Sequence, residues 1–166
     1  MIRPADLRST MPLAKQFSPT EALDKARRYC AVQERGHQEV RDKLYAWGLH
    51  RAQVEDAIGR LIGEGFLNEQ RFAETFAVSK FHQKGWGRIK IEHELKARRI
   101  SGPCIKLGLK AIDEEEYMVT LKRLVQRRWA LEKAHAAPMR RQRVIRYLLS
   151  RGFEMDRVEA ALPGRS

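Results

Sequence analysis

The chain has 166 residues, of which 43% are hydrophobic and 33% are charged. This length suits one ordinary domain or a short array of small units, and the apolar content supports a packed core and argues against global disorder. No apolar run approaches the roughly 20 residues that span a bilayer, and residues 1–17 lack the apolar core of a secretory signal, so we expect a cytoplasmic protein without membrane association.

Basic residues dominate the charge of the chain. The 33 Lys and Arg stand against 21 Asp and Glu, which gives a formal net charge of +12. A charge of this size attracts polyanions, so nucleic acid or an acidic protein surface is the expected partner. The alternative is a small basic protein that is merely soluble and adhesive.

An apolar pattern recurs three times along the chain, with an offset of 51 residues in the first step and 53 in the second. Its first copy comprises Val40, Leu44, Gly48, Leu49, Val54 and Ile58. The second comprises Ile91, Leu95, Arg99, Ile100, Ile105 and Leu109. The third comprises Val144, Leu148, Gly152, Phe153, Val158 and Leu162. Because a period of this length is typical of helical arrays, we predict an all-α fold of three tandem three-helix repeats forming an elongated, curved array.

Breakers and capping residues divide the chain into five segments. We expect a flexible N-terminal tail over residues 1–17 and a C-terminal tail over residues 163–166. The three repeats are placed at residues 18–67, 68–112 and 113–162.

Capping patterns begin the first helix of each repeat. Ser18-Pro19-Thr20-Glu21 predicts a helix that runs to about Arg35, and Asn68 predicts one that runs to Lys84. Asp113-Glu114-Glu115-Glu116 predicts a long helix to about His135. The apolar side chains that this long helix is expected to bury are Tyr117, Leu121, Leu124, Val125 and Leu131.

Glycine and proline mark the other helices. In the first repeat we expect a helix over residues 37–47, then Gly48 in the left-handed conformation. The third helix of that repeat carries an apolar stripe of Val54, Ala57, Ile58, Leu61 and Ile62. In the later repeats, Gly85-Trp86-Gly87, Ser101-Gly102-Pro103 and Pro138 separate the helices.

Four short motifs resemble the pattern of the RecX regulators. They are Gly65-Phe66-Leu67-Asn68-Glu69-Gln70-Arg71-Phe72-Ala73, Gly85-Trp86-Gly87 followed by Lys90, Ile91, Glu94 and Leu95, the ending Arg151-Gly152-Phe153, and the helix Gln38 to Leu44. Their order and spacing cover about residues 20–162. The sequence departs from the pattern at Asn68, where Asp is usual, at Arg88, where Pro is frequent, and at Glu92, where a basic residue is common.

The resemblance implies a cytoplasmic, non-catalytic regulator of DNA recombination. It further implies three tandem three-helix repeats, binding along the helical groove of a RecA–single-stranded DNA filament, and reduced RecA strand exchange and ATP hydrolysis. Composition and periodicity alone establish none of these activities.

Two basic clusters are the candidate binding residues. Between Lys122 and Arg151, ten basic residues accompany a single acid, Glu132, and helical spacing predicts that Arg140, Arg143 and Arg146 face outward in a row. Guanidinium groups suit carboxylates and phosphates, but such a row is also consistent with a solvated face. The partner-binding or nucleic-acid-binding residues that we select are Lys84, Trp86, Arg88, Lys90, Arg98, Arg99, Arg127, Arg140, Arg143 and Arg146.

The second basic cluster comprises Lys80, Lys84, Arg88, Lys90, Lys96, Arg98 and Arg99. Trp86 lies in the turn of this cluster, between two glycines. Its indole is suited to anchor an interface or to stack on a base. The alternative, equally consistent with the sequence, is that Trp86 packs between the first two helices of its repeat.

No pattern of catalytic or metal-binding residues occurs in the sequence. The five histidines show no His-Glu-x-x-His spacing, and neither a P-loop nor a dinucleotide fingerprint is present. Cys30 and Cys104 lie far apart without CxxC spacing, which is typical of reduced thiols, although the sequence does not exclude a disulfide. We therefore expect no enzyme activity, no metal and no cofactor.

Two functions remain open at this point. One is a regulator that binds the RecA filament, alone or together with single-stranded DNA. The other is a sequence-independent nucleic-acid-binding helical module. Three capped repeats favour a monomer in either case.

Overall fold

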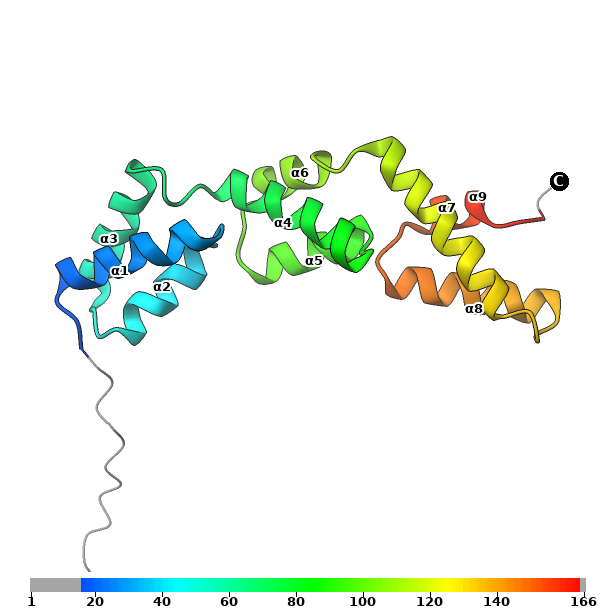
Figure 1. Cartoon of the computed structure of the whole chain (residues 1–166), viewed down its shortest axis with the longest axis horizontal. Helices are drawn as coiled ribbons and strands as arrows, with labels where there is room; N and C mark the ends of the chain where they lie inside the picture. Colours follow the sequence, from blue (N-terminus) through cyan, green and yellow to red (C-terminus); the bar gives the residue numbers. More distant parts are fainter. Residues whose placement is uncertain (1–15, 165–166) are drawn as a thin grey trace, which may run out of the picture. The chain divides into compact units, whose positions relative to one another are not determined.

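The structure is a computed structural model that describes residues 16–164. Within this range the chain is entirely helical, with nine helices arranged as three consecutive groups of three and no strand; Figure 1 labels them α1 to α9. This confirms the predicted all-α fold of tandem three-helix repeats. The chain divides into two compact units, which we call unit 1, ending at Leu67, and unit 2, beginning at Asn68.

Unit 1 is the first three-helix group, with α1 at Pro19–Val32, α2 at His37–Ala46 and α3 at Arg51–Gly63. The predicted capping box is present: the Glu21 backbone N–H donates to Ser18 Oγ at 3.2 Å, and the Ser18 N–H donates to Glu21 Oε2 at 3.0 Å. Most of the predicted N-terminal tail lies outside the described residues. The Phe17 N–H donates to the Trp47 carbonyl at 3.0 Å.

Helix α1 ends at Val32 and not at the expected Arg35. The Arg35 side chain turns back instead: its Nε donates to the Tyr29 carbonyl at 3.3 Å, and its guanidinium lies 3.8 Å from the Tyr29 ring centroid. An arginine that satisfies a carbonyl of the last turn can act as a side-chain cap, so the helix has no need to continue to that residue.

The core of unit 1 follows the predicted register. Its buried residues are Ala22, Leu23, Ala26, Cys30, Val40, Leu44, Leu49, Val54, Ala57, Ile58, Leu61 and Leu67. Ile62 was expected in the same stripe but is exposed, because it lies one residue, or about 100°, past Leu61 around the helix. Cys30 and Cys104 are free thiols, and burial raises the pKa of Cys30 to about 11.

Unit 2 begins with α4 at Glu69–Lys84, α5 at Arg88–Ala97 and α6 at Gly102–Lys110. Asn68 Oδ1 accepts the Arg71 N–H at 2.8 Å, as predicted for the cap. Helices α4 and α6 approach closely, since a Cβ added to Gly108 would lie 2.8 Å from the Ala73 carbonyl carbon and oxygen. The glycine therefore permits the closest helix contact of this repeat.

The last group contains α7 at Glu114–Leu131, α8 at Ala137–Ser150 and α9 at Met155–Ala161. The prediction that α7 reaches His135 and buries Leu131 is wrong: the helix ends at Leu131, whose side chain is 69% exposed. Glu132 turns inward instead and is only 5% exposed, because Arg128 and Arg143 bind its carboxylate. The spacing of apolar residues does not predict that a buried, ion-paired glutamate follows the end of α7.

The triple register holds at the backbone as well as in the core. Val40, Ile91 and Val144 are fully buried, as are Leu44, Leu95 and Leu148. The turn positions Gly48, Arg99 and Gly152 all have positive φ, at 93°, 59° and 91°. Arg99 is the one non-glycine with positive φ among residues 16–164. The repeat therefore imposes a left-handed turn residue even where the sequence has arginine.

Candidate functional site

Two of the short motifs meet in unit 2, where the α4–α5 turn docks on the α8–α9 turn. The Gly87 N–H donates to the Arg151 carbonyl at 2.7 Å, and the Ile89 N–H donates to the Gly152 carbonyl at 3.0 Å. A Cβ on Gly87 would lie 2.3 Å from the Gly152 carbonyl carbon and oxygen. The Arg151 guanidinium also donates to the Lys84 carbonyl. Gly85-Trp86-Gly87 and Arg151-Gly152-Phe153 thus form a joint between the second and third repeats.

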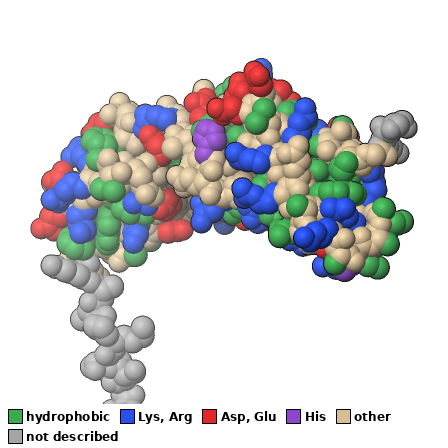
Figure 2. Space-filling model, turned by 45° about the vertical axis from the view of Figure 1, so that its right-hand side comes forward, with side chains coloured by type: hydrophobic (Ala, Val, Ile, Leu, Met, Phe, Trp, Pro, Cys, Tyr) green, Lys and Arg blue, Asp and Glu red, His purple; other side chains and the backbone are tan. Residues whose placement is uncertain are grey.

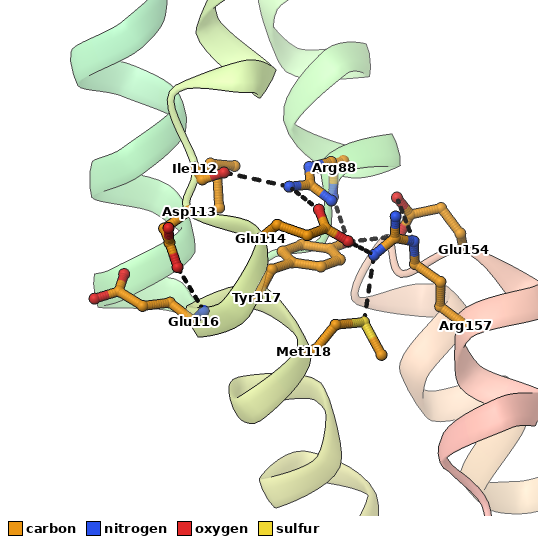
Figure 3. A network of polar contacts seen from close by, with 9 residues as sticks. All are labelled: Arg88, Ile112, Asp113, Glu114, Glu116, Tyr117, Met118, Glu154 and Arg157. Atoms are coloured by element: carbon orange, nitrogen blue, oxygen red, sulfur yellow. Dashed lines mark hydrogen bonds and ion pairs between the residues drawn. The ribbon is translucent and has the colours of Figure 1, made fainter.

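A polar network continues this joint around Tyr117, as Figure 3 shows. The Arg88 backbone N–H donates to Tyr117 Oη at 3.0 Å, and Tyr117 Oη donates to Glu154 Oε2 at 2.6 Å. Burial raises the pKa of the Tyr117 phenol, and the hydrogen bond to Glu154 raises it further. One buried hydroxyl therefore connects the start of α5 to the start of α9.

Arg88 is held by the same network. Its Nη2 lies 2.9 Å from Glu114 Oε2 and donates to the Ile112 carbonyl at 3.3 Å, and its guanidinium lies 4.0 Å from the Tyr117 ring centroid. Arg157 pairs with Glu114 as well, and the pKa of Glu114 is lowered first by Arg157 and then by Arg88. Because the Arg88 side chain is 16% exposed, the structure places this candidate binding residue inside the joint.

The α7–α8 turn holds two further candidate residues. Arg140 donates to the Trp129 carbonyl from Nε at 2.8 Å and from Nη2 at 2.6 Å, and its guanidinium lies 4.3 Å from the Trp129 ring centroid. Arg143 Nε donates to Glu132 Oε2 at 2.6 Å, which lowers the pKa of Glu132. Arg140 is half-buried, so the predicted outward row is wrong for this residue; Arg143 is exposed as predicted, but it is paired with Glu132. The helical spacing alone contains no information about those neighbours.

Other candidate cations remain available to a partner. The exposed side chains that make no ion pair among the described residues include Lys84, Arg99, Arg127 and Arg146. Lys122 and Arg123 on α7 share this property, and Arg123 lies one helical turn before Arg127. We call these six exposed cations the free basic surface of unit 2.

A row of alternating cations and aromatic rings lies on α4 and α5. Lys80 Nζ is 5.4 Å from the ring centroids of both Phe76 and Trp86. Lys90 Nζ is 4.7 Å from the Trp86 centroid, and the Arg98 guanidinium is 4.7 Å from the Phe76 centroid. We call these five residues the cation–aromatic row. It joins the predicted Trp86, Lys90 and Arg98 to Phe76 and Lys80, which were not selected from the sequence.

Trp86 combines features of both interpretations that its sequence position allowed. Its ring is partly buried against the core of unit 2, while Lys80 and Lys90 lie over it. The four-residue spacing of Phe76 and Lys80 on one helix was the signal that could have added them to the site, since such residues are neighbours on a helix surface.

Charge differs sharply between the two units. Residues 16–67 contain eight Lys and Arg against eight Asp and Glu, whereas residues 68–164 contain 21 against 12, an excess of nine positive charges. On the face shown in Figure 2, red and blue side chains are intermixed over the left-hand part. Red gathers at the top of the middle part, and blue lies below it and to its right.

Residues 16–164 contain neither a membrane-spanning helix nor a cluster of metal-ligating side chains. No helix in residues 16–164 is long and apolar enough to cross a membrane. Within the same range, no three His, Cys, Asp or Glu side chains gather as a metal site would require.

Comparison with known proteins gives one consistent result. Three RecX family models match the chain: the first three-helix domain at residues 22–61, the second at residues 68–109 and the third at residues 114–162. A protein named regulatory protein RecX from Pseudomonas fluorescens is 34% identical over 137 residues, which cover 81% of this chain and 85% of the relative. A RecX from Pseudomonas savastanoi is 32% identical over 140 residues, with the same coverage.

Solved structures agree on the fold. The crystal structure of RecX from Lactobacillus salivarius superposes with a TM-score of 0.80 at 19% identity, over 86% of this chain and 93% of that one. A second crystal structure of regulatory protein RecX gives a TM-score of 0.78 at 19% identity, over 86% of this chain and 70% of that one. From the three domain matches and the similarity to curated relatives, the chain belongs to the RecX family of regulatory proteins.

Proposed function

We propose that this chain is a non-catalytic regulator that binds the RecA–single-stranded DNA filament and lowers RecA ATP hydrolysis and strand exchange. The observation that supports this proposal is the excess of nine positive charges in residues 68–164, with free cations on α7 and α8, in a chain of a regulatory family. A nucleoprotein filament presents phosphates and acidic protein groups, which attract such a surface. The same proposal assigns the chain to the cytoplasm, as a monomer that needs no cofactor.

The dimensions of unit 2 suit a filament. Helix α7 has 18 residues, which at the helical rise makes it about 27 Å long. The joint at Gly87 and Gly152 couples α7–α9 to α4–α6. A rigid unit of this length can contact two successive protomers, and that contact would oppose the protomer motions that accompany ATP hydrolysis.

The direct test is a titration of RecA ATPase on single-stranded DNA with the purified full chain. The proposal expects ATP hydrolysis to fall as the chain approaches stoichiometric amounts, and strand exchange to fall with it. Unchanged ATPase and strand exchange at that ratio would contradict the proposal.

A second candidate function is sequence-independent binding of nucleic acid, which the cation–aromatic row favours. If about six phosphates of a single strand are neutralised, the logarithm of the binding constant falls with the logarithm of salt concentration at a slope near −4. A slope near zero on bare DNA would remove this candidate and leave the filament regulator untouched.

A further inference from the structure

We propose that the cation–aromatic row of unit 2 is a base-stacking site for single-stranded nucleic acid. In this site the Phe76 and Trp86 rings take unpaired bases, and Lys80 and Lys90 meet the phosphates. Arg98 borders the Phe76 ring and is paired with Glu94 at 3.0 Å. The inference goes beyond regulation of a protein filament, because it requires contact with the nucleic acid itself. It also stands on one three-helix group, so it does not depend on how the two units are placed.

The geometry of the row carries the proposal. Lys80 lies one turn after Phe76 on α4, and Trp86 occupies the turn that follows. The Lys80 ammonium is 5.4 Å from both ring centroids, so one cation contacts both rings. Lys90 and Arg98 flank the row at its two ends, each 4.7 Å from the neighbouring ring centroid.

The groups that cover the rings are exchangeable. Both rings are partly buried against the core, where Phe76 also packs on the Phe72 ring, and this packing holds them in position while cations lie over both. A lysine ammonium is a compact charge on a flexible four-carbon stem. A flat base can therefore replace the ammonium on the ring, and the displaced ammonium can move to the adjacent phosphate. Such alternation of rings and cations is the pattern by which proteins bind single strands without reading their sequence.

The rings also predict selectivity for single strands. Cations alone bind any phosphate backbone, whereas stacking requires a base whose face is free. In a duplex each base face is already stacked on its neighbour. The row should therefore prefer single-stranded over double-stranded nucleic acid and show little preference among sequences.

Unit 1 contains a similar set of residues that should not bind. Lys25 Nζ lies 4.7 Å from the Phe17 centroid and 5.2 Å from the Trp47 centroid. These two rings pack edge to face on each other, with centroids 6.3 Å apart. The adjacent hollow is lined by the acids Glu21 and Asp24 as well as by Lys25 and Arg28, so the acids offset the attraction of its cations for phosphates. Unit 1 thus supplies a matched control within the same chain.

The test measures fluorescence anisotropy of a labelled oligo-dT, an abasic strand of equal length and a duplex, with the full chain and no RecA. Trp86→Leu keeps an apolar side chain but loses the flat ring. It should weaken oligo-dT binding roughly fivefold to a hundredfold and leave abasic binding unchanged. Trp47→Leu should change neither, and circular dichroism should show full helicity in both variants.

A second pair of variants tests the cation without touching an aromatic ring. Lys80→Gln should reduce the salt slope on single strands by about 0.7, while Lys25→Gln should leave that slope as it is. Equal slopes for Lys80→Gln and the wild type would contradict the phosphate contact.

Several results would overturn the stacking site. They are equal oligo-dT binding by Trp86→Leu and wild type, equal losses on the oligo-dT and abasic strands, tight binding to duplex, or no binding of wild type to single strands. If Trp86→Leu kept DNA binding but no longer inhibited RecA, the row would be a protein interface, and this result would also overturn the inference. A wild-type chain that binds bases but leaves RecA unaffected would contradict the proposed function alone.

Discussion

Unit 1 and unit 2 share the same three-helix plan but use their charged side chains differently. In unit 1, arginines lie in ion pairs that include Arg27 with Glu64, Arg41 with Glu55, and Arg60 with Asp56, and residues 16–67 carry no net charge. In unit 2, the cations outnumber the acids, and many of them have no acidic partner among residues 68–164. The common register fixes the packing, and the surface charge distinguishes the roles.

The joint sharpens this comparison. In unit 2, the ion pairs of Arg88 with Glu114 and of Arg143 with Glu132 connect one helix to the next group of residues packed against it. Its exposed cations without an ion pair include Lys84 and Arg99 as well as those of α7 and α8. We infer that the paired ions position the unit while the unpaired ones are left to contact a partner.

The largest expected effects come from the equivalent leucines of the three repeats. Leu44, Leu95 and Leu148 are fully buried, so replacing each by Ala should reduce the free energy of unfolding by about 2–5 kcal/mol. Hydrogen exchange should place the loss of Leu44→Ala in α1–α3 and the losses of the other two in unit 2. Unchanged stability in all three variants would contradict the register.

A smaller effect is expected at the joint, which unit 1 does not have. Gly87→Ala puts a methyl group against the Gly152 backbone and should destabilise unit 2 by about 1–3 kcal/mol. The matched control is Gly59→Ala in α3, where nothing lies within 4 Å of the added Cβ. That control should stabilise unit 1 by about 0.5–1 kcal/mol. Urea unfolding measures both, and a neutral Gly87→Ala would argue against the tight turn contact.

The smallest stability effect concerns acid pH. Arg143, and then Arg128 and His135, hold the pKa of Glu132 below its ordinary 4.5. A depressed folded-state pKa contributes stability that is fully present above pH 4.5 and is lost as pH falls through the lower folded value. Glu132→Gln should therefore flatten the stability profile of unit 2 below pH 4.5. A profile parallel to that of the wild type in this window would remove the role of the Glu132 contacts.

The sequence predicted the features that local patterns encode. The period of the apolar residues placed Leu44, Leu95 and Leu148 in the core, and Gly48 adopts the left-handed conformation that was predicted for it. Caps were equally readable, since Ser18, Asn68 and Asp113 all accept backbone N–H groups. Such patterns act within a few residues, so no tertiary knowledge was needed.

The site was less predictable, because it depends on which helices meet. Arg143 lies on the outward side of α8 by helical spacing, yet it binds Glu132. Glu132 directly follows α7 and lies eleven residues earlier in the chain. Arg88 likewise pairs with Glu114, which the sequence explained only as a capping acid. Phe76 was not selected from the sequence, and its place beside Lys80 and Arg98 is apparent only once α4 and α5 pack together.

The central claim is that the free basic surface of unit 2, and not unit 1, meets the partner. The direct measurement is equilibrium binding to RecA filaments on single-stranded DNA by two charge-reversed variants. Arg127→Glu with Arg146→Glu alters exposed cations of unit 2, and Arg28→Glu with Arg51→Glu alters exposed cations of unit 1. The account predicts that the unit 2 variant binds several-fold more weakly, mainly through slower and more salt-sensitive association, while the unit 1 variant binds like the wild type. Equal binding by both variants, or a larger loss for the unit 1 variant, would contradict it.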